Sequence, residues 1–168
     1  MIHLSQSRSS IIFEREADSL SILYWGKKIA NLSPDFEKSI DSALHRSSAH
    51  GGLDNAIGSL VLREHSRGWS GHPALRGHRS GVSASNNFTV KSLSQKDQTL
   101  TVEFEDAIAG LEISMTYTLT ESDILLMDAE VKNVADGDYF LEHFLYWLPL
   151  AEQADEVLDF YGHWTKER

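Results

Sequence analysis

Hydrophobic and polar residues alternate with a period of two through much of the second half of the chain. Leu100, Val102 and Phe104 alternate with polar residues, and the same alternation runs from Leu111 to Leu119. Successive side chains of a strand point to opposite faces, so this pattern predicts strands with one face on a core and one in water. Turn-forming residues separate these segments near 94–98, 106–110, 120–123 and 135–138. Short breaks between strands predict an antiparallel meander.

The segment Tyr139–Leu148 has apolar residues on both of its faces. Such a pattern is typical of a strand that is covered on both sides. We therefore expect a central strand of a two-sheet sandwich here, with a surface that binds a partner as the alternative.

Upstream, Ser19–Ile29 is expected to form another aromatic strand, and a short helix is expected from Pro34 to about Arg46. Ser33 suits the N-cap of this helix, Pro34 suits its first position, and apolar residues recur every four residues along it. Residues 47–59 are expected to form a loop. The predicted fold class is mainly β: an antiparallel β-sandwich with one or two short helices, in a single domain over residues 1–168.

Charge and composition exclude several classes of function. The net charge is −10, and residues 97–159 hold sixteen acidic residues against the single base Lys132. This argues against nucleic acid or an anionic membrane as a partner. The chain has no cysteine, no secretory leader pattern and no apolar run long enough to cross a bilayer, so we expect a cytoplasmic protein without disulfides.

Residues 66–81 are unusual in composition, with four glycines, one proline, three arginines, two histidines and a tryptophan. Glycine and proline are so dense that the segment is expected to be a loop, and loops of this kind often hold ligands. The spacing of His65, His72 and His78 does not favour a metal site, and no motif indicates a cofactor.

The remaining side chains suit a polyhydroxylated ligand. Sugars are bound by carboxylates, by arginine or histidine donors, and by aromatic faces against their C–H groups. Residues of these types are Asp54, Trp69, Arg76, His78 and Arg79. From residue types alone the alternatives stay open: Asp54 as a turn residue, Trp69 as part of the core and Arg79 as a surface group.

Three segments in order along the chain carry a family resemblance. They are L-Y-W-G-K at 23–27, G-W-S-G-H-P-A-L-R-G-H-R at 68–79 and L-P-L-A-E-Q-A-D-E-V-L-D-F-Y-G-H-W-T-K-E-R at 148–168. Together they resemble the N-terminal domain of family thirty-six glycoside hydrolases, the bacterial α-galactosidase type, and most closely its actinobacterial branch. His163 departs from the arginine that is more usual in the family.

The resemblance implies a large β-sandwich, a supersandwich, followed by a (β/α)₈ barrel that cleaves terminal α-galactosides with retention. The two catalytic carboxylates lie on that barrel. It is expected downstream of this chain, so no residue here is expected to be catalytic, and the sandwich itself is expected to be incomplete. By resemblance, Asp54 in G-L-D-N binds galactose hydroxyls, and Trp69 and Arg79 are weaker candidates for distal sugars or domain packing.

The expected partners are an α-galactoside, bound through the parent enzyme, and the catalytic barrel of that enzyme. An uncovered sheet edge or apolar face also predicts a homo-oligomer. Two alternatives remain at this point. One is a free-standing carbohydrate-binding β-sandwich, and the other is a structural interaction module without a ligand.

Overall fold

A computed structural model describes residues 1–44, 59–82, 85–150, 156 and 158. It contains nine strands, one α-helix and one 3₁₀ helix in these ranges. The strands are β1 (Ile2–Ser5), β2 (Ser9–Glu16), β3 (Ser19–Lys27), β4 (Leu75–His78), β5 (Thr89–Lys96), β6 (Thr99–Asp106), β7 (Leu111–Leu119), β8 (Leu125–Asn133) and β9 (Phe140–Phe144). The helices are α1 (Pro34–Leu44) and η1 (His65–Arg67).

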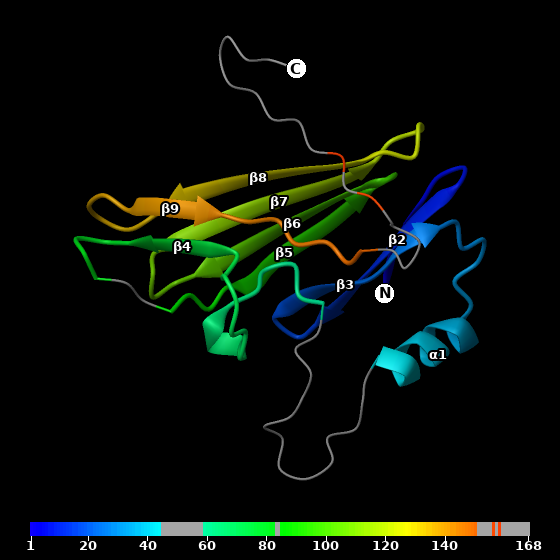
Figure 1. Cartoon of the computed structure of the whole chain (residues 1–168), viewed down its shortest axis with the longest axis horizontal. Helices are drawn as coiled ribbons and strands as arrows, with labels where there is room; N and C mark the ends of the chain where they lie inside the picture. Colours follow the sequence, from blue (N-terminus) through cyan, green and yellow to red (C-terminus); the bar gives the residue numbers. More distant parts are fainter. Residues whose placement is uncertain (45–58, 83–84, 151–155, 157, 159–168) are drawn as a thin grey trace.

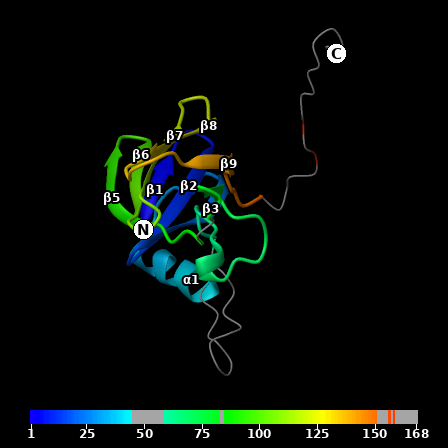
Figure 2. The same cartoon turned by 90° about the vertical axis from the view of Figure 1, so that its left-hand side faces the viewer.

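The strands form three antiparallel sheets, ordered β1-β2-β3, β4-β9 and β5-β6-β7-β8. In Figure 1 the β1–β3 sheet and the β4–β9 pair lie towards opposite ends of the four-stranded sheet. In Figure 2, turned by 90°, α1 lies below β2 and β3, and β7 and β8 lie above them. The expected mainly-β antiparallel sandwich is confirmed.

One core joins the sheets, because the alternating apolar residues of β6 and β7 point inwards as the sequence predicts. Tyr117 of β7 is almost fully buried and meets Phe13 of β2 edge-on, with 4.9 Å between the ring centroids. The fully buried members are Leu4, Ile11, Ile12, Phe13, Leu20, Ile22, Leu100, Leu111, Ile113, Met115, Tyr117 and Leu119. The outer face of the sheet carries acidic residues. The alternation of side chains along each strand therefore explains both the apolar core and the acidic surface.

Hydrogen bonds of Asp123 connect two of the sheets in addition to the apolar core. Asp123, in the turn between β7 and β8, accepts hydrogen bonds from the Ser7 hydroxyl at 2.6 Å and from the backbone N–H groups of Arg8 at 3.0 Å and Ser9 at 2.9 Å. These donors hold the pKa of the Asp123 carboxyl well below its usual range. The β1–β2 hairpin is thereby fixed to the turn of the opposite sheet.

Helix α1 confirms its sequence signals. The Ser33 hydroxyl accepts from the backbone N–H of Phe36 at 3.2 Å, which caps the first turn. The helix ends at Leu44, two residues before the predicted end, and the loop expected at 47–59 lies almost wholly outside the described residues. In the part of the chain that the structure describes, no helix is long and apolar enough to cross a membrane.

The expectation of a central strand at Tyr139–Leu148 is wrong. The strand β9 covers only Phe140–Phe144, and its partner is β4 in a two-stranded sheet. Phe140 is 56% exposed and Leu141 48% exposed. Apolar residues on both faces of a strand predict that both faces are buried. They do not indicate whether the same chain or another one buries them.

Candidate functional site

The glycine-rich segment 66–81 is not a continuous loop, and this expectation is corrected in part. Gly68, with a φ of 88°, ends the 3₁₀ helix η1. The chain then turns back, and the backbone N–H of Ala74 donates to the carbonyl of Arg63 at 2.7 Å. Leu75–His78 form β4, which pairs with β9 through a register shift next to Gly77. Because the chain returns on itself, residues on both sides of the segment meet in one place.

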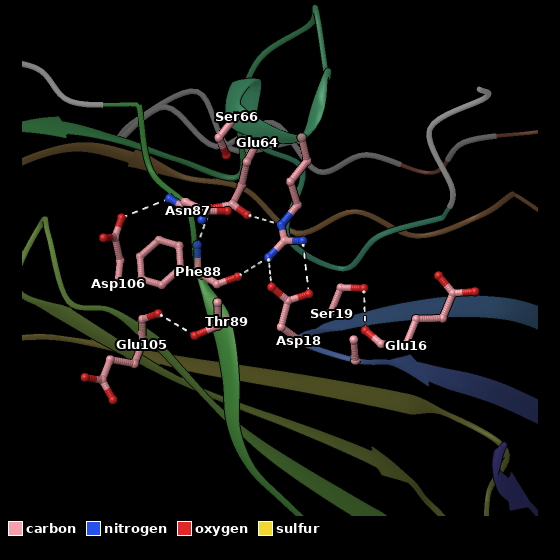
Figure 3. Close-up of polar contacts among 12 residues, drawn as sticks. Glu16, Asp18, Ser19, Glu64, Ser66, Asn87, Phe88, Thr89, Glu105 and Asp106 are labelled. Carbon is pink, nitrogen blue, oxygen red and sulfur yellow. Dashed lines mark hydrogen bonds and ion pairs between the residues drawn. The ribbon is translucent and has the colours of Figure 1, made fainter. Parts of the chain in front are cut away.

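Glu64 lies at the centre of this arrangement, and Figure 3 shows its contacts. Its side chain is only 5% exposed. One carboxylate oxygen accepts from the backbone N–H of Phe88 at 2.8 Å, and the other accepts from Nε of Arg67 at 3.0 Å. Arg67 also donates to the Phe88 carbonyl at 2.7 Å and reaches Asp18 at 3.4 Å. The ion pair therefore joins the start of β5, the β2–β3 turn and η1.

Burial raises the pKa of Glu64 to about 7, although the Phe88 N–H and the Arg67 guanidinium both act in the opposite direction. Desolvation disfavours the charged form of a carboxyl group more strongly than two donors restore it. Glu64 is thus a buried carboxyl group that titrates near neutral pH, which is a property often found at functional sites.

A pocket of about 350 Å³ opens beside Glu64. Its walls come from the segment Glu64–Gly77 and from the chain that leads into β5. The lining residues are Glu64, His65, Pro73, Leu75, Arg76, Gly77, Ser85 and Asn86. The volume is within the range of small-molecule sites, which run from about 300 to 1,000 Å³.

Trp69 is half-buried and has contacts on several sides. Its indole N–H donates to the carbonyl of His72 at 2.8 Å. The guanidinium carbon of Arg63 lies 4.2 Å from the ring centroid of Trp69 and 3.6 Å from that of Trp147. Arg63 therefore lies between two indoles. Its two cation–π contacts connect the glycine-rich segment with the chain after β9. Burial lowers the pKa of Arg63, and its Nε has no hydrogen-bond partner.

Arg79 binds two turns at one end of the sandwich. Its Nη1 donates to the carbonyls of Asp136 at 2.9 Å and Gly137 at 2.8 Å. Its Nη2 donates to the carbonyl of Ala109 at 3.2 Å and to Oδ1 of Asn133 at 2.7 Å. These four bonds use every N–H of the two terminal nitrogens. In this structure Arg79 joins the hairpin after β4 to the β6–β7 and β8–β9 turns.

Arg79→Lys is expected to lower the free energy of unfolding by about 1–2 kcal/mol, because an ammonium group cannot reach four acceptors in the geometry of the guanidinium fork. Urea denaturation measures this change. The control is Arg76→Lys, since Arg76 makes an exposed ion pair with Glu142 and should change stability by less than about 0.5 kcal/mol. Equal stabilities for the two variants would contradict the role of Arg79 as a clamp.

The predicted sugar-binding residues are only partly placed by the structure. Asp54 lies outside the described residues. Trp69 and Arg79 engage different neighbours, Trp69 next to Arg63 and Arg79 at the turns around Asn133.

The histidines of the segment also have separate surroundings. His65 contacts the Gly71 carbonyl through Nε2 at 2.9 Å, and His78 stacks on Phe140 with 5.2 Å between centroids. Within the ranges that the structure describes, no three metal-ligating side chains gather.

Sequence reasoning noted Arg63 only as part of a local excess of arginine, and it missed the burial of Glu64 and the position of Arg63 between two indoles. Charged residues are usually exposed, so nothing in the dipeptide itself indicated burial. The available signal was its position between the apolar run Leu60–Leu62 and a glycine-rich turn.

Comparisons with known proteins extend this picture. Residues 18–168 match the model of the glycosyl hydrolase family 36 N-terminal domain. The chain is 34% identical over 165 residues to an alpha-galactosidase of Escherichia coli. The match covers 98% of this chain and 22% of that protein. The chain thus spans about a fifth of the length of this relative.

Solved structures share the fold. The galactosidase domain of the alpha-galactosidase-sucrose kinase AgaSK superposes with a TM-score of 0.67 at 18% identity, over 86% of this chain and 23% of that one. The A355E variant of the GH36 alpha-galactosidase AgaA of Geobacillus stearothermophilus, in complex with 1-deoxygalactonojirimycin, gives a TM-score of 0.59 at 19% identity, over 79% of this chain and 22% of that one. A variant of the same enzyme in complex with raffinose gives 0.58 at 18% identity, with the same coverage.

Proposed function

Because the chain belongs to the glycosyl hydrolase family 36 N-terminal domain family, we propose that it is the non-catalytic part of an enzyme that hydrolyses terminal α-galactosides with retention. The observation that carries the proposal is the 34% identity to an alpha-galactosidase over 98% of this chain. The chemistry would take place on a (β/α)₈ barrel outside these 168 residues, with two carboxylates about 5 Å apart.

In this proposal the sandwich shapes the sugar pocket of the parent enzyme. Asp54 is its proposed ligand for galactose hydroxyls, since a carboxylate accepts hydrogen bonds from neighbouring hydroxyl groups. Trp69 and Arg79 are proposed to support the pocket or the contact with the barrel. The fixed orientation of Trp69 beside Arg63 supports a role for its indole as a rigid surface.

The test uses the complete protein that the gene encodes. It is expected to release galactose from an aryl α-galactoside, with the α-anomer formed first in proton NMR. Asp54→Ala is expected to lower kcat/KM by roughly 10- to 100-fold, the effect of losing a charged hydrogen bond. Asp138→Ala, an exposed aspartate in the β8–β9 turn, is the matched control.

No α-galactosidase activity in the complete protein would overturn the proposed function. Equal activity of the Asp54 and Asp138 variants would overturn only the role of Asp54.

Assembly and location complete the proposal. The exposed apolar side chains of β9, Phe140 and Leu141, support a homo-oligomer or another covered interface. The cytoplasmic location expected from the sequence is part of the proposal too.

A second candidate function, a carbohydrate-binding module, is favoured by the pocket beside Glu64.

A further inference from the structure

Of the described residues whose types suit a sugar ligand, Arg76 lines the pocket beside Glu64. Neither Trp69 nor Arg79 is among its lining residues. Its walls are fixed by contacts that do not depend on a ligand: β4 pairs with β9, and the carbonyl of Asn86 accepts from the hydroxyl of Ser66. The pocket is therefore a formed feature of this sandwich.

The walls of the pocket combine apolar and polar surfaces. Pro73 is the apolar lining residue that offers surface to a ligand, because Leu75 is only 3% exposed. The lining set also holds the side chains of Arg76, Asn86 and His65, which offer donors and acceptors. A pyranose ring presents the same combination, because it has an apolar C–H face and an equatorial set of hydroxyl groups.

Charge limits the ligand further. The Glu64 carboxyl is matched by Arg67, with 3.0 Å between Oε2 and Nε. The Arg76 guanidinium is matched by Glu142, with 2.7 Å between Nε and Oε2. An anion at the exposed Arg76 guanidinium would compete with Glu142 for it, whereas a neutral ligand leaves both pairs intact. The pocket thus suits an uncharged polyhydroxylated molecule better than a phosphate or a carboxylate.

We propose that this pocket binds one neutral hexopyranose unit, with the terminal N–H groups of Arg76 and the amide of Asn86 as its polar contacts and Pro73 against its C–H face. It is a saccharide site formed by described residues of the sandwich. The choice of a galactoside as its ligand rests on the proposed function.

The experiment titrates the ¹⁵N-labelled 168-residue chain with methyl α-D-galactopyranoside and follows the backbone amides of Gly77 and Asn86 by NMR. Saturable shifts in the millimolar range are expected. Arg76→Gln is expected to weaken binding by about tenfold, the effect of one hydrogen bond to a charged group. Lys91→Gln is the matched control, because Lys91 makes exposed ion pairs with Glu105 and Glu112 on the outer face of the sheet.

D-galacturonate, an anionic sugar, is expected to bind no more tightly than the neutral probe. Tighter binding of the anion would overturn the argument from charge. Absent shifts at Gly77 and Asn86, or equal binding by the Arg76 and Lys91 variants, would overturn the site itself. These results are independent of catalysis: an active complete enzyme with an empty pocket refutes this site alone, and an inactive enzyme refutes the proposed function alone.

Discussion

Replacing Glu64 with alanine is expected to lower the free energy of unfolding by about 3 kcal/mol. The substitution removes the acceptor of the Phe88 N–H and of the Arg67 Nε, and both donors lie where water has little access. A buried donor without a partner keeps its full desolvation cost, so the loss exceeds that of an ordinary hydrogen bond. Urea denaturation followed by tryptophan fluorescence measures the change.

Asp18→Ala provides the control within the same network. Asp18 also pairs with Arg67, but its side chain is 52% exposed and the distance is 3.4 Å. Its loss is expected to cost less than about 1 kcal/mol, as for other exposed ion pairs. If both variants lost the same stability, Glu64 would not be the centre of the network.

The pKa of Glu64 gives this network a dependence on pH. Burial raises that pKa to about 7 from its ordinary value of 4.5. The folded protein therefore binds this proton more tightly than the unfolded chain does. The part of the stability that comes from this tighter proton binding is full below pH 4.5 and is lost as the pH rises from 4.5 through about 7. Relative to the wild type, Glu64→Gln is expected to be more stable at pH 8 than at pH 5, and an equal difference at both pH values would contradict the raised pKa.

The sequence was sufficient for the parts of the fold that depend on local pattern. The alternation over β6 and β7 predicted both strands and the residues that they bury, because one face of each packs on the core. The cap at Ser33 and the start of α1 at Pro34 also followed from local preference. In each case a single neighbouring layer or a few adjacent residues determine the structure.

Features that depend on distant segments were not predictable in the same way. β4 was expected to be loop, since glycine is rare within strands, and it forms because β9 lies alongside it. β9 was expected to be central, but its place is at the edge of the described structure, paired with β4 alone. Its hydrophobic residues were expected to be covered on both sides, and Phe140 and Leu141 are exposed in the described structure instead.

The candidate site also has features that the sequence predicted and features that depend on distant segments. The glycine-rich segment and Trp69 were visible from composition, because loops with these residues are unusual. The stack of Arg63 between Trp69 and Trp147 was not visible, since 78 residues separate Arg63's partners along the chain. The burial of Glu64 likewise depends on Phe88 and Arg67, which only the fold brings to it.

Gly77→Ala is expected to lower the free energy of unfolding by about 3 kcal/mol, at the upper end of the cost of overpacking. A Cβ at this buried position would lie 2.6 Å from the backbone carbonyl oxygen of Phe140 and 2.5 Å from the ring of Tyr139. The carbonyl belongs to the strand that pairs with β4, so it cannot move without separating the two strands. Thermal and urea denaturation measure the loss.

The comparison variant is Gly26→Ala in β3, where a Cβ would approach the Tyr24 hydroxyl at 2.9 Å, the far end of a side chain that can rotate. Both glycines lie in strands, so differences in strand propensity cancel between the two variants. A clearly larger loss at position 77 would therefore measure the close approach of β4 to β9. Because Gly77 and Arg76 also line the pocket, that approach is what gives the pocket one of its walls, and equal losses at both positions would mean that β4 can move away from β9 at little cost.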